Sequence, residues 1–102
     1  MANITEARKV LVARIVEGEG QASTAQRRAA FNDAGLGEPL KGLVEKVARQ
    51  ARQIADQDIA AVRASGLSED QIFEIVVCAA AGQAVRQHDA ALAALDAATR
   101  KE

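Results

Sequence analysis

IFEIVVCAAAGQAVRQH, residues 72 to 88, is the stretch that decides the fold we expect for this 102-residue chain. From Ile72 to Gly82 it contains one charged side chain, Glu74, and the chain's only cysteine, Cys78, and it ends at the chain's only histidine, His88. The stretch is either a core helix that carries a few polar residues or a helix whose polar side chains form an active site.

Helical geometry divides this stretch into two sides. At about 100° per residue, one broad side carries Glu74, Cys78, Ala81, Val85 and His88. Both sides begin apolar and become polar toward the C-terminal end. We therefore expect the first half to be core and the second half, from Gln83, to be the edge of an interface or a pocket.

The rest of the chain also favours helices, so we predict an all-α single domain. Apolar residues at helical spacing predict a first helix over 4–16, stopped by Gly18 and Gly20. Ser23 or Thr24 is a candidate N-cap for a second helix that ends near Gly35. Pro39 suits the first turn of a longer helix with an apolar stripe up to Ile54. That helix either continues or is interrupted by a break or kink near Ala55, where Asp56 is a candidate N-cap for a separate helix over 58–65. Ser68 and the acidic residues after it predict a last helix that runs to about Ala98.

Composition limits the partners that the chain can have. Alanine is abundant and two residues are aromatic, so the expected core has small side chains and self-association would add stability. A formal net charge of -1 gives no attraction for nucleic acid or an anionic membrane surface. No apolar run approaches the length of a membrane span. A lone cysteine and a mixed polar N-terminal sequence predict a cytoplasmic protein with no internal disulfide, and the sequence suggests no metal site and no cofactor.

The candidate catalytic residues lie at spacings that do not favour reaction. His88 is about 15 Å along the helix from Cys78, too far for a cysteine–histidine pair within one helix. For Cys78 the alternatives are an inert buried thiol and a reactive one, and a carboxylate at Glu74 would disfavour the thiolate. Glu74 either meets solvent or a basic partner, or is a buried acid that serves as general acid or base. His88 is expected to be exposed.

Arg86 and Gln83 are candidates for ligand binding, together with Glu74. Arg86 follows an apolar helix face, where an arginine usually anchors an interface or a neighbouring loop, and less often an anionic ligand.

Residues 40 to 95, and above all ADQDIAAVRASGLSEDQIFEIVVCAAAGQAVRQHDAALAAL, resemble the AhpD-like, or carboxymuconolactone decarboxylase-like, all-helical family. In that family a helix ending in small residues and glycine leads through a capped turn into a long apolar helix. In many peroxidase-related members that helix carries Asn or Gln and then Arg three residues on, as Gln83 and Arg86 do. The resemblance implies a helical core over 39–102, preceded by a helical segment over 1–38, and assembly through the long helix into trimers or hexamers.

The chain departs from the family at its catalytic signature. Peroxidase members carry Cys-x-x-Cys-x-x-x-His on the helix before the glycine, and the corresponding positions here are Ala51, Ile54 and Asp58. Dithiol peroxidase activity is therefore disfavoured. The decarboxylase branch uses a histidine-bearing segment that has no counterpart in this sequence.

Two functions from different classes follow. In the first, the protein is a non-catalytic homo-oligomer that binds a small molecule or a partner between its helices, with Glu74, Gln83 and Arg86 as polar anchors. In the second, it is an enzyme with a repurposed site, using Cys78 against peroxides, or Glu74 with Asp58 or His88 of a neighbouring subunit in decarboxylase-like acid–base chemistry. We favour the first because no catalytic pair has a reactive spacing.

Overall fold

The protein is all-α. The computed structural model describes the backbone of residues 2–100 and the side chains of residues 5–100, and no strand occurs in this part of the chain. In chain order the elements are α1 (Ala2–Glu17), α2 (Thr24–Asn32), α3 (Leu40–Arg49), the 3-10 turn η1 (Ala51–Gln53), α4 (Asp56–Ala64) and α5 (Glu69–Arg100).

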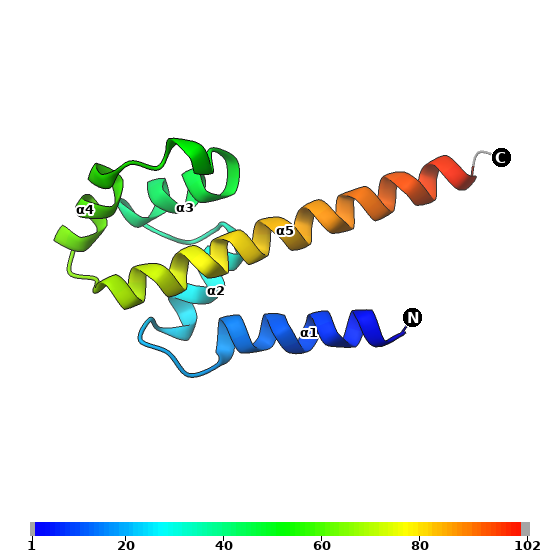
Figure 1. The fold of residues 1–102 in the computed structure, drawn as a ribbon, viewed down its shortest axis with the longest axis horizontal. Helices are drawn as coiled ribbons and strands as arrows, with labels where there is room; N and C mark the ends of the chain where they lie inside the picture. Colours follow the sequence, from blue (N-terminus) through cyan, green and yellow to red (C-terminus); the bar gives the residue numbers. More distant parts are fainter. Residues whose placement is uncertain (1, 101–102) are drawn as a thin grey trace.

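The first half of α5 organises the bundle. In Figure 1, α1 runs along one side of α5, α2 crosses it closely, and α3 and α4 cover its beginning. The core contains small and medium-sized side chains, as expected from the composition. Its buried members are Val16, Ala22, Ala30, Leu40, Leu43, Val44, Val62, Ile72, Ile75, Cys78 and Ala79.

The second half of α5 extends beyond the bundle (Figure 1). Every residue from Arg86 to Arg100 is exposed, although Leu92 and Leu95 are apolar. The molecule is consequently long, 55 × 29 × 21 Å, with a radius of gyration of 15.6 Å, whereas a compact chain of this length has one of about 13 Å.

The helix that follows Pro39 is shorter than the sequence predicts. Pro39 is its N-cap, but α3 ends at Arg49 and the chain passes through η1 into extended backbone at Ile54 and Ala55. The predicted break therefore begins at Gln50. A tertiary contact fixes the next helix start, because Asp58 accepts a hydrogen bond from the Ala55 N–H and pairs with Lys46 of α3.

The C-terminal end of α2 also differs from the expected glycine cap. Asp33 takes the left-handed conformation at φ 53°, two residues before Gly35, which has a positive φ as well. The N–H groups of Asp33 and Ala34 satisfy carbonyls at the end of α2. The Asp33 carboxylate pairs with Arg49 of α3 at 3.0 Å, so the unusual cap joins two helices.

Candidate functional site

Glu74 holds the loop between α1 and α2. Its carboxylate accepts hydrogen bonds from the backbone N–H groups of Gln21, at 2.8 Å, and Ala22, at 2.9 Å. These hydrogen bonds, followed by the charge of Arg27, lower the pKa of Glu74 below its ordinary value. Gly20 leaves room for the contact, because a Cβ there would lie 2.5 Å from the carboxylate. Glu74 is therefore ionised and engaged with the protein's own backbone.

Arg27 is a buried charge that sequence analysis missed. Its side chain is 5% exposed and donates to the backbone oxygens of Ala22 and Ile15. The sequence signal was weak, since Arg27 and Arg28 together suggest a solvated face. Arg28, which pairs with Glu17, is exposed.

Cys78 is fully buried on the face of α5 that packs against α1. Its thiol lies 3.4 Å from the backbone oxygen of Ile15, to which it donates. Burial raises the pKa of the thiol above its ordinary value of 9.0, and the charge of Arg27 opposes this shift without reversing it. A protonated thiol without solvent access is a poor nucleophile.

Arg86 and Gly82 of α5 contact the backbone at the C-terminal end of α2. The Arg86 guanidinium donates to the Phe31 backbone oxygen at 2.6 Å and lies 3.4 Å from the side-chain oxygen of Gln83. A Cβ on Gly82 would lie 1.9 Å from the same Phe31 oxygen, so only glycine permits this approach. Arg86 thus binds the protein's own backbone in this structure, and the Gln83 side chain accepts from Arg86.

Glu74 and Arg86 act on opposite ends of one helix. α2 has no acidic residue in its first turn and no basic residue in its last. α5 supplies both, an acid beside the N-terminal end and a base at the C-terminal end, which complements the helix dipole. These predicted anchors therefore have a structural role, although Glu74 also borders a small pocket of about 150 Å³ between α1 and α5.

The remaining candidates, Asp58 and His88, lie on different helices and are each engaged elsewhere. Hydrogen bonds from Ala55 and Lys46 lower the pKa of Asp58. His88 is exposed, with its Nδ1 3.2 Å from the Arg8 guanidinium, which also pairs with Asp89. Glu74 and Cys78 are neighbours on α5, but neither Asp58 nor His88 is bonded to them. Among the described residues, no group of three or more His, Cys, Asp or Glu side chains is placed so that it could hold a metal ion.

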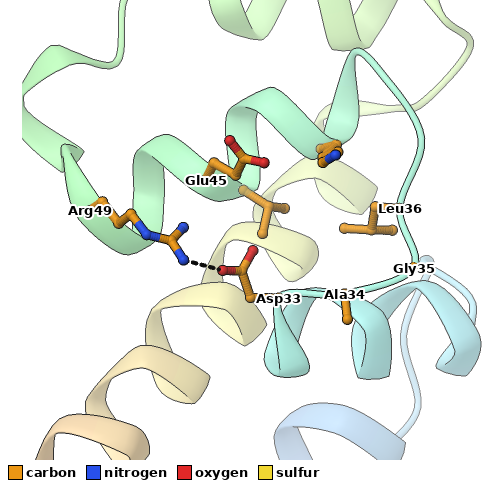
Figure 2. Close-up of a pocket in the computed structure, with 8 residues that line it drawn as sticks. Asp33, Ala34, Gly35, Leu36, Glu45 and Arg49 are labelled. Carbon is orange, nitrogen blue, oxygen red and sulfur yellow. Dashed lines mark ion pairs between the residues drawn. The ribbon is translucent and has the colours of Figure 1, made fainter.

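A pocket that sequence analysis did not identify lies between α3 and the α2–α3 loop. It has a volume of about 310 Å³, and Figure 2 shows charged side chains of α3 facing Asp33 and the loop. Leu36 and Val44 form an apolar part of the pocket wall. The complete lining is Asp33, Ala34, Gly35, Leu36, Lys41, Val44, Glu45 and Arg49. The sequence contains a signal for the α3 wall, since Lys41, Glu45 and Arg49 recur every four residues, but it does not show which loop faces them.

Neither an active-site motif nor a relative identifies this pocket. Comparison of the chain with protein-family models, curated proteins and solved structures finds no match. Within residues 2–100, no helix has the length and apolar character needed to cross a membrane.

Proposed function

We propose that this protein is a non-catalytic member of the AhpD-like fold that self-associates and binds a small molecule in the pocket of Figure 2. Its buried, protonated Cys78 weighs against thiol chemistry. The positions that correspond to the dithiol signature do not share one helix face, because Ala51 lies in η1, Ile54 is extended and Asp58 lies in α4.

The observation that carries the binding proposal is the charge pattern of the pocket. Asp33 and Arg49 pair with each other across it. Lys41 and Glu45 also line it, and no salt bridge among the described residues engages either of them. One ammonium and one carboxylate beside apolar wall fit a small zwitterion with a short aliphatic part, the chemistry of a free amino acid.

The binding proposal is tested by adding L-valine, L-leucine or glycine to the ¹⁵N-labelled protein and following its amide NMR signals. Saturable shifts at Gly35, Leu36 and Lys41 are expected. Arg49→Gln, which opens the Asp33 pair, should weaken them several-fold. Arg52→Gln is the matched control, because Arg52 is exposed on η1 and lies outside the pocket. Absence of saturable shifts at millimolar amino acid would contradict the proposal.

Self-association is supported by the amount of exposed surface. The chain exposes 7025 Å², whereas a compact monomer of 10.7 kDa exposes about 5,500 Å². The difference of about 1,500 Å² exceeds the roughly 800 Å² that each partner buries in a standard interface. Sedimentation equilibrium at micromolar to millimolar concentration tests this, and a single monomeric mass throughout would contradict it.

A further inference from the structure

Six residues on one side of α5, four of them apolar, form a regular stripe that continues from the bundle into the free half of the helix. Its members are Ala81, Val85, His88, Leu92, Leu95 and Thr99, separated by gaps of four, three, four, three and four residues. This alternation of fours and threes is the spacing of residues that pack between two helices in a coiled coil.

The two halves of the stripe have different surroundings. Ala81, Val85 and His88 line a groove of about 250 Å³, whose other wall is formed by Leu11, Val12 and Ile15 of α1, with Arg8 at its edge. In the other half, Leu92 and Leu95 are 51% and 62% exposed and no described side chain covers them. One half is therefore an open apolar groove and the other an apolar ridge.

The spacing of the stripe is the same in both directions, with its centre at residue 90. When two α5 helices lie antiparallel about a two-fold axis at this point, Val85 of each copy faces Leu95 of the other. His88 likewise faces Leu92, and Ala81 faces Thr99. Each of these three pairs joins a residue from the groove half of one stripe to a residue from the ridge half of the other. The arrangement therefore covers the groove and the ridge of both copies.

The charges near the axis agree with this arrangement. Arg8 and Asp89 form an ion pair at 2.9 Å beside the stripe. The two-fold axis brings two such pairs together, so two cations and two anions meet and the net local charge is zero. On the other side of the stripe, Ala84, Ala91 and Ala98 leave room for close approach of the backbones.

We infer that a second copy of this chain docks on this surface, with the free half of each α5 lying antiparallel in the α1–α5 groove of the other. The interface is isologous, because the same residues contribute from both copies. The inference rests on the self-association proposed above and adds its partner, its register and its two-fold symmetry.

Substitutions on the full-length chain test the register. Leu95→Asp places an unpaired charge in the interface and should weaken dimerisation roughly a hundredfold or more in sedimentation equilibrium. Leu95 is exposed in the single chain, so the variant should keep its helical circular dichroism. Ala94→Asp is the matched control, because it adds the same charge one residue away, on the opposite side of α5, and should leave the dimer intact. A wild-type oligomer that survives Leu95→Asp overturns this docking mode and leaves self-association standing, whereas a wild-type monomer overturns both. A trimeric mass also overturns the two-fold mode.

Spin labels test the direction of the helices. Ala90→Cys and Ala97→Cys introduce labelling sites on the outer side of α5, and the buried Cys78 should not react in the folded protein. The antiparallel model places the two labels at position 90 level with each other and separates those at position 97 by about 21 Å along the axis. Equal distances at the two positions would indicate parallel helices and overturn the model.

Discussion

At the scale of single residues, Glu74 links the stability of the fold to pH. Because its pKa is lowered in the folded state, the unfolded chain binds more protons as the pH falls below the ordinary value of 4.5. The contribution of Glu74 is therefore complete at neutral pH and is lost as the pH falls through the lower folded pKa. Asp58, with an ordinary pKa of 3.8, acts in the same direction.

Replacing Glu74 by Gln is expected to reduce the free energy of unfolding by about 1–2 kcal/mol at pH 7. The carboxylate now accepts hydrogen bonds from two backbone N–H groups. In the variant, the side-chain NH₂ group, which is a donor, would face one of these N–H groups, so that hydrogen bond would be lost. Urea unfolding at pH 7 and pH 4 measures the effect, and the difference between variant and wild type should shrink at the lower pH. Glu19→Gln, at an exposed position of the same loop, should change neither value. Equal stability of Glu74→Gln and wild type at pH 7 would contradict the role given to this carboxylate.

Cys78 is expected to stay unreactive in the folded protein. Its raised pKa and its burial both withhold the thiolate, so a chromogenic disulfide should react with it only at the rate of unfolding. Comparing this rate in native buffer and in denaturing urea checks the expectation. Rapid reaction below pH 7 in native buffer would instead support the peroxidase alternative.

At the scale of elements, Gly82 sets how closely α2 and α5 approach. Gly82→Ala is expected to destabilise the protein by about 1–3 kcal/mol, because the new Cβ cannot coexist with the Phe31 carbonyl at its present position. Gly42→Ala in α3 is a matched helical control. There the new Cβ would meet only the end of the flexible Glu38 side chain at 3.0 Å, and the gain of up to about 1 kcal/mol in helix propensity should offset the displacement. Thermal unfolding of both variants tests whether Gly82→Ala lowers the stability and Gly42→Ala leaves it unchanged.

The helices themselves could be predicted because their signals are local. Gly18 and Ser23 delimit α1 and α2 as expected, and the acidic turn after Ser68 starts α5. The end of α3 at Arg49 could not be predicted, because the apolar spacing continues to Ile54 and the competing contact, between Lys46 and Asp58, is tertiary. A division into segments 1–38 and 39–102 stays a prediction.

The roles of the candidate site residues depended on contacts that sequence spacing does not contain. The positions of His88 and Cys78 along α5 explain the exposure of His88, which was expected, and the burial of Cys78, which was one of two alternatives. For Glu74 and Arg86 the partners are backbone groups more than 50 residues away. Polar residues on an apolar helix were therefore recognisable as anchors, but what they anchor was not. Trimeric or hexameric assembly and the cytoplasmic location likewise stay predictions.

At the scale of the whole molecule, self-association should make thermal stability depend on protein concentration. A dimer that forms only between folded chains gains about 0.7 kcal/mol per chain for each tenfold rise in concentration, which is about 3–6 °C in Tm for a domain of this size. Scanning calorimetry over a hundredfold range of concentration measures the shift. Leu95→Asp should abolish the dependence, and a wild-type Tm that is independent of concentration would contradict self-association.

The contacts that Glu74 and Arg86 of α5 make on the two sides of α2 also bear on the order in which the helices form. Nine residues are too few to form a stable helix alone, and α5 adds distant partners on both sides of α2, 53 residues from Gln21 in the preceding loop and 55 residues from Phe31 in its last turn. The caps of α2 at Ser23 and Asp33 are local, but a chain loop of that length must close before Glu74 and Arg86 make their contacts, whereas α5 can nucleate locally over its 32 residues. We therefore expect α5 to form first and to act as a template, and α2 to acquire its helical structure on docking, late in a cooperative transition.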